Sequence, residues 1–138
     1  MILQVLIHVL PGLIALALAA AVVLRLGSRR QKVAMTAVML CWIGATLGQV
    51  LTGELTLPLI AGDAVFSLWL LWFAWRGPEW WVWVLLAVEA ARLMLHSIAY
   101  GASMETGYTI LNNCLSLSGL ADLTAAALIQ AWSARSRR

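Results

Sequence analysis

WWVWVLLAVEAARLMLHSIAY, residues 80–100, is an apolar stretch long enough to cross a bilayer as a helix, which takes about 20 residues. Three ionisable residues interrupt it, Glu89, Arg92 and His96. Their spacing of i, i+3 and i+7 places them on one stripe of a helix, and this stripe must contact protein or water. The opposite face, predicted to contact lipid or other helices, consists of Ala87, Ala91, Met94 and Ile98.

Four more apolar segments fill the rest of the chain, residues 2–24, 33–51, 58–75 and 108–133. The breaks between them are short and rich in glycine, charge and turn formers. Of the 138 residues, 63% are hydrophobic and 11% charged, with a mean hydropathy of +0.92, whereas a soluble domain carries about 25% charged residues. This composition excludes a soluble enzyme, a disordered tail and a disulfide scaffold. It predicts an all-α integral membrane protein, a single domain built as a bundle of five transmembrane helices with short loops.

The Lys and Arg residues indicate how the bundle is oriented. Eight of the nine lie after the first segment, between the third and fourth, or after the fifth. With five crossings these places fall on one side, and an excess of basic residues marks the cytoplasmic side. The sequence therefore predicts a multi-pass protein of the bacterial inner membrane with its N-terminus outside and its C-terminus inside. The net charge of +3 is interpreted as a topology signal, and no nucleic-acid partner is predicted.

The tryptophans and cysteines are predicted to be structural. Trp and Tyr prefer the membrane interfaces, and five tryptophans surround the turn at Arg76, namely Trp72, Trp75, Trp80, Trp81 and Trp83. We interpret this cluster as an interfacial anchor. Cys41 and Cys114 stand singly, without the CxxC spacing of redox or metal sites, and are expected to be buried free thiols.

Nine polar residues stand inside the apolar segments, where ionisable groups are costly and mark a functional site or a specific pairing between helices. The helical rise of about 1.5 Å per residue places most of them in the outer half of the bilayer. The candidates for a proton, cation or ligand site are Glu89, Arg92, His96, Asp63 and Asp122. The supporting polar residues are His8, Gln49, Asn112 and Asn113. No metal site and no catalytic residue is predicted.

Arg92 keeps its charge and therefore needs an acidic partner, which we predict to be Glu89 or Asp63. Arg92 can neutralise only one of the three acids, Asp63, Glu89 and Asp122. The other two must be protonated, bind a cation or contact water. We expect at least one of Glu89 and Asp122 to be protonated at neutral pH, with Glu89 the better candidate for a working group. Alternatively, these polar groups only join helices through hydrogen bonds.

Two functional hypotheses follow. The first is an accessory or structural subunit of a larger membrane assembly, favoured because it explains the near absence of soluble parts. The second is a proton-, cation- or small-solute-binding transporter or channel, which needs a homo-oligomer because five helices can scarcely enclose an alternating-access path. Further alternatives are a phage-type holin and a protein that holds haem b between His8 and His96. No catalytic motif such as GxSxG or HExxH is present, so neither an enzyme nor a bound cofactor is predicted.

Overall fold

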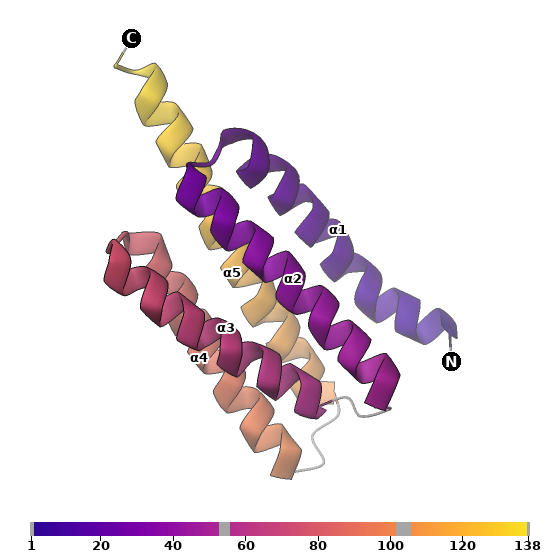
Figure 1. Ribbon diagram of the computed structural model, residues 1–138. Helices are drawn as coiled ribbons and strands as arrows, with labels where there is room; N and C mark the ends of the chain where they lie inside the picture. Colours follow the sequence, from indigo (N-terminus) through magenta and orange to yellow (C-terminus); the bar gives the residue numbers. More distant parts are fainter. Residues whose placement is uncertain (1, 53–55, 102–105, 138) are drawn as a thin grey trace.

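The computed structural model describes residues 2–52, 56–101 and 106–137. For residues 2–9, 11, 49, 50, 52, 56, 100, 101, 106, 107 and 109 it describes the backbone and not the side chain. The described residues form five α-helices and no strand (Figure 1). The helices are α1 (Ile2–Leu26), α2 (Arg29–Thr52), α3 (Thr56–Arg76), α4 (Trp80–Gly101) and α5 (Thr106–Arg135). Each predicted segment lies inside one of these helices, which confirms the all-α fold class.

Four of the helices are long and apolar enough to cross a membrane. The segments that meet both criteria are Arg29–Gly48, Leu57–Arg76, Trp80–Ala99 and Ile110–Arg135. In α1 the apolar stretch with described side chains, Gly12–Leu26, is shorter. A helical bundle with these spans is compatible with a multi-pass membrane protein.

α2 begins at Arg29, earlier than the apolar pattern predicts, because a capping box precedes it. The hydroxyl oxygen of Ser28 accepts a hydrogen bond from the backbone N–H of Gln31 at 3.2 Å. In return, Oε1 of Gln31 accepts one from the backbone N–H of Ser28 at 2.8 Å. Such reciprocal bonds satisfy donors that the start of a helix leaves free. At the end of α1, a β-carbon on Gly27 would lie only 2.5 Å from the carbonyl oxygen of Val23, so this close approach requires glycine.

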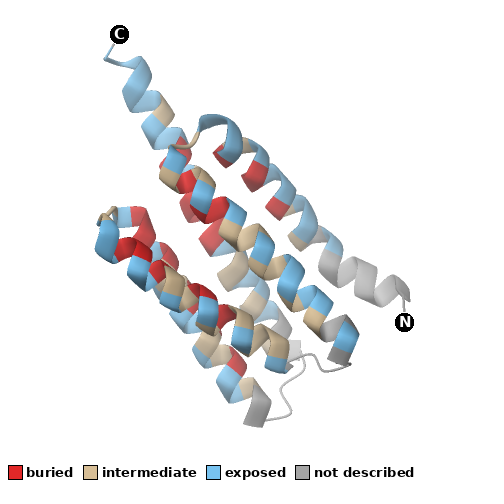
Figure 2. Ribbon diagram, viewed as in Figure 1, coloured by how far each residue is buried: buried red, intermediate tan, exposed pale blue. Residues whose placement is uncertain are grey.

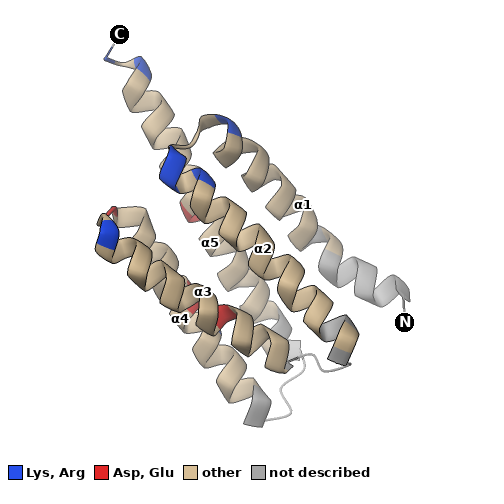
Figure 3. Cartoon of the chain, in the orientation of Figure 1, with Lys and Arg blue, Asp and Glu red and all other residues tan. Residues whose placement is uncertain are grey.

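The helices are arranged as a closed ring in which neighbours in sequence are neighbours in space (Figure 1). α1 contacts α2, α2 contacts α3, α3 contacts α4, α4 contacts α5 and α5 contacts α1, and α2 also contacts α5. The two termini lie at opposite ends of the bundle. Lys and Arg residues gather at the end that carries the C-terminus (Figure 3). This basic end comprises Arg25, Arg29, Arg30, Lys32, Arg76, Arg135 and Arg137.

The apolar core concentrates in the half of the bundle next to the basic end (Figure 2). All five helices contribute fully buried side chains to it, among them Val23, Met35, Leu70, Leu85 and Leu123. Small residues are buried on the two helices that close the ring, Ala19 and Ala20 on α1 and Ala126 and Ala127 on α5. Because small side chains let helix backbones approach closely, they favour tight packing of α1 against α5.

The tryptophans near the turn between α3 and α4 divide into two groups. Trp72, Trp75, Trp80 and Trp83 are exposed, as interfacial anchors would be. Trp81 is only 1% exposed, and its indole N–H donates to Oε2 of Glu79 at 2.7 Å. The prediction for Trp81 is therefore wrong. Consecutive residues of a helix point about 100° apart, so adjacent tryptophans cannot all face outward.

Both cysteines are free, as predicted, but they are not both buried. Cys41 is half-buried on α2, whereas Cys114 is exposed on α5. Cys114 shares its face of α5 with the exposed side chains of Ile110 and Leu117, one turn away on either side. The expectation of burial fails for Cys114 because this face points away from the other helices.

Candidate functional site

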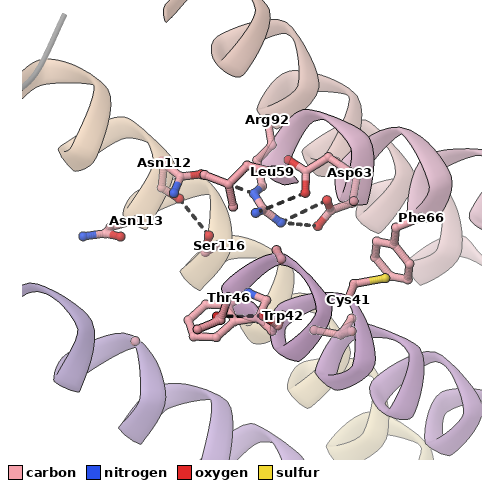
Figure 4. Close-up of a pocket in the computed structure, with 15 residues that line it drawn as sticks. Cys41, Trp42, Thr46, Leu59, Asp63, Phe66, Arg92, Asn112, Asn113 and Ser116 are labelled. Carbon is pink, nitrogen blue, oxygen red and sulfur yellow. Dashed lines mark hydrogen bonds and ion pairs between the residues drawn. The ribbon is translucent and has the colours of Figure 1, made fainter. Parts of the chain in front are cut away.

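A cavity of about 200 Å³ lies in the half of the bundle away from the basic end (Figure 4). Its wall draws on all five helices, with Gly12 as the contribution of α1. The polar side chains on this wall are Thr46, Asp63, Glu89, Arg92, Asn112, Asn113 and Ser116, and the rings of Trp42 and Phe66 also line it. A buried water needs about 10–15 Å³ of such space, so the cavity has room for several waters or one small solute.

Arg92 is the centre of the polar cluster, and all three nitrogens of its guanidinium group contact a partner. Nη1 donates to both carboxylate oxygens of Glu89, each at 3.0 Å. Nη2 lies 3.3 Å from Oδ1 of Asp63, and Nε donates to Oδ1 of Asn112 at 3.4 Å (Figure 4). Arg92 therefore joins α3, α4 and α5. The sequence predicted one acidic partner, Glu89 or Asp63, and the structure brings both to the same guanidinium.

His96 connects the same cluster to α5. Its Nε2 lies 2.9 Å from Oδ2 of Asp63, although the N–H direction is not aligned for a hydrogen bond. Its Nδ1 lies 2.6 Å from the hydroxyl of Tyr108. Because a carboxylate can only accept, we assign the ring proton to Nε2, so that Nδ1 accepts from Tyr108. No signal in the sequence pairs Tyr108 with His96.

The geometry of α4 agrees with the periodicity of its sequence. As whole residues, Glu89, Arg92 and His96 are 4%, 6% and 0% exposed, and Asp63 on α3 is 6% exposed. Met94 and Ile98 are exposed, as are the two alanines of the opposite face, Ala87 and Ala91. One face of α4 therefore supplies three members of the cluster.

Asp122 does not belong to the cluster. It is buried on α5, ten residues beyond Asn112, which corresponds to about 15 Å along the helix. Asp122 is not part of the cavity wall, and its Oδ2 has no hydrogen-bond partner among the described residues. Asn113 lies on the wall but is exposed and points away from Arg92 (Figure 4).

The side chains of His8 and Gln49 lie outside the described residues, so the structure does not place them in or out of the cluster. For the haem hypothesis, the described part of the chain gives the position of His96 alone. Both of its ring nitrogens already face a partner, Asp63 on one side and Tyr108 on the other. Among the residues with described side chains, no group of three or more His, Cys, Asp or Glu is arranged to hold a metal ion.

The charges of the cluster do not balance when both acids are ionised and His96 is neutral. Asp63 and Glu89 contribute two negative charges, and Arg92 contributes one positive charge. A net charge of −1 in a buried site is costly unless one more positive charge is bound. One more proton bound to the cluster, or a cation in the cavity, would each restore neutrality.

Fold and site together define a helical bundle with several membrane-compatible spans and a buried ionisable cluster beside a cavity. No known protein family, curated protein or solved structure matches the chain.

Proposed function

We propose that the chain is a five-pass protein of the bacterial inner membrane that binds a proton or a small monovalent cation in the cavity beside Arg92. In this proposal the N-terminus is outside and the C-terminus inside, so the basic end lies at the cytoplasmic surface. The observation that carries the proposal is the contact of two buried carboxylates, Asp63 and Glu89, with a single guanidinium.

The proton and the cation would compete for the same charge deficit. With one more proton bound, the cluster is neutral and the cavity needs no cation. When a cation binds next to Asp63 and Glu89, the proton becomes surplus and leaves. Binding of the cation is therefore expected to release up to one proton from each chain.

The lining of the cavity fits an organic cation better than a bare metal ion. Trp42 and Phe66 line it together with the two carboxylates, and aromatic ring faces attract ammonium groups. A volume of about 200 Å³ accommodates a small quaternary ammonium compound. A strongly hydrated metal ion would have to lose much of its water before it could contact the apolar part of the lining.

A second hypothesis is that the chain is an accessory subunit in which the cluster only joins α3, α4 and α5. Buried polar contacts between membrane helices contribute about 1 kcal/mol each and need no ligand. Under this hypothesis added cations release no proton. Transport by the cation-binding protein would require a homo-oligomer, whereas an accessory subunit would be found in a complex with other chains. The mass of the assembly in gentle detergent therefore distinguishes the two hypotheses.

The test measures proton release from purified protein in weakly buffered detergent that contains a pH indicator. Tetramethylammonium chloride is added, with sodium chloride at the same ionic strength as the comparison. The native chain is expected to release up to one proton for each tetramethylammonium bound. Asp63→Asn and Glu89→Gln each remove the charge deficit, so both variants should release none.

Asp122→Asn is the matched control because it neutralises a buried acid outside the cavity. This variant should release protons as the native chain does. If the native chain folds but releases no proton with either salt, the accessory-subunit hypothesis is favoured. If Asp122→Asn abolishes the release as well, the site is not the cavity beside Arg92.

A further inference from the structure

A second binding surface lies at the basic end, on the opposite half of the bundle from the cavity. There, the start of α2 and the end of α3 form an open groove of about 670 Å³. Arg29, Arg30 and Arg76 line it, together with the aromatic side chains of Trp69, Trp72 and Phe73. This volume falls within the range of about 300–1,000 Å³ that is typical of small-molecule sites.

The three arginines differ in how far their charges are satisfied. Arg30 donates to the carbonyl oxygen of Phe73 at 2.7 Å and lies 3.4 Å from Oε1 of Glu79, so it is fixed in place. Arg29 and Arg76 are exposed, and no Asp or Glu among the described residues forms an ion pair with either of them. The guanidinium of Arg76 lies over the ring of Trp72, with its central carbon 5.2 Å from the ring centre. Three arginines and one acid leave the groove with a surplus of positive charge, which suits an anion.

The floor of the groove is apolar and continues along the helices away from the basic end. Trp69 stacks against Phe73 with ring centres 4.8 Å apart. On α3 the exposed side chains of Trp72, Leu68 and Val65 follow at helical spacing, so they share one face. On α2 the exposed Val33 and Leu40 likewise lie two turns apart on one face. A bound molecule with a phosphate at the arginines could therefore lay an acyl chain along these two faces.

We propose that this groove binds the headgroup of an anionic phospholipid, with its phosphate between Arg29 and Arg76 and an acyl chain against α2 and α3. Guanidinium groups match phosphate oxygens in geometry and charge, and basic pockets between membrane helices bind such headgroups. The apolar continuation favours a lipid over free phosphate, because free phosphate would leave the aromatic floor uncovered.

The test is native mass spectrometry of the full chain released from detergent micelles that contain phosphatidylglycerol or, for comparison, phosphatidylcholine. The native chain is expected to retain phosphatidylglycerol and to lose phosphatidylcholine. In the double variant R29Q/R76Q, binding of phosphatidylglycerol should weaken about twenty-fivefold, since each basic residue near a membrane surface contributes about fivefold. Both arginines are exposed, so the variant is expected to fold. Its elution volume in size-exclusion chromatography checks this.

The double variant R135Q/R137Q is the matched control, since it removes the same charge from the basic end but outside the groove. If the control weakens binding as much as R29Q/R76Q, the attraction is spread over the whole basic end and the groove is not a site. If inorganic phosphate displaces phosphatidylglycerol at equal concentration, the groove recognises free phosphate and the lipid proposal is wrong. Equal retention of the two lipids would also overturn it.

Discussion

Replacing Arg92 by methionine removes the only cation among the described residues that contacts Glu89, while methionine keeps most of the volume of the side chain. Asp63 also loses a contact at 3.3 Å, but it keeps His96 at 2.9 Å. Breaking a buried ion pair from one side costs about 3–5 kcal/mol, because the remaining charge is uncompensated. The side chains of Arg92, Glu89 and Asp63 are at most 9% exposed, so solvent does little to relieve this cost. R92M is therefore expected to lower the folding equilibrium constant by roughly 10²- to 10⁴-fold.

Second substitutions in R92M show which acid causes the loss. Since His96 still faces Asp63, Glu89 is the acid left without a cation, and E89Q should restore more stability than D63N. The triple variant R92M/E89Q/D63N has no unpaired carboxylate, and replacing a buried ion network by neutral groups of similar volume is often close to neutral. It should therefore be the most stable of the R92M variants.

Stability is measured by titrating sodium dodecyl sulfate into protein in a mild detergent and following the helical signal by circular dichroism. Arg30→Met is the comparison, because its ion pair with Glu79 is about one third exposed and contributes at most about 1 kcal/mol. Its hydrogen bond to the carbonyl oxygen of Phe73 adds about 1 kcal/mol, so the loss should stay below that of R92M. The reasoning is refuted if R92M unfolds at the same detergent ratio as the native chain. It is also refuted if neither E89Q nor D63N restores stability, since Arg92 would then be satisfied by water or a lipid headgroup.

Three further predictions test other parts of the structure. Reporter fusions after residues 55 and 104 should be active outside the cell and fusions after residues 78 and 138 inside it, because the basic end is expected to be cytoplasmic; external activity at Arg138 would overturn the orientation. Gly27→Ala should lower the stability by about 1–3 kcal/mol in the same detergent titration, since its β-carbon would lie 2.5 Å from the carbonyl oxygen of Val23, whereas an unchanged midpoint would mean that the turn shifts at no cost. Tyr108→Phe should cost about 1–3 kcal/mol, because it leaves Nδ1 of the fully buried His96 without its partner, and a loss below about 0.5 kcal/mol would show that water replaces the hydroxyl.

The helices could be predicted because membrane-spanning segments have a strong signal in length and composition. The stripe of Glu89, Arg92 and His96 could be predicted for a similar reason, since helical periodicity alone places the three on one face. Asp63 could be named as one of two alternative partners of Arg92, because the helical rise places both residues in the outer half of the bilayer. These predictions need only the geometry of single helices.

The remaining contacts depend on how helices rotate relative to one another, which no single segment encodes. A tyrosine near the end of a helix, such as Tyr108 on α5, is normally expected at the membrane interface. Only the packing of α5 against α4 brings it to His96. In the same way, Trp81 is buried and its neighbour Trp80 exposed because only one side of α4 packs against α3. From the sequence, Gln31 is expected in a basic loop between Arg30 and Lys32, whereas its side chain is buried in the cap of α2.

Closure of the ring by α1 and α5 has a consequence for the biosynthesis of the protein. In the five-pass arrangement proposed above, the helices would enter the membrane in the order of synthesis, so α1 would be present long before α5 could cover the face with Ala19 and Ala20. The hydrogen-bond partners that α5 gives to α4, Asn112 for Arg92 and Tyr108 for His96, also arrive last. Until the fifth helix inserts, an ionised side chain of α4 lies at a face that is still open to lipid. The protein-conducting channel, or a membrane chaperone beside it, would have to hold the first four helices until the chain is nearly complete.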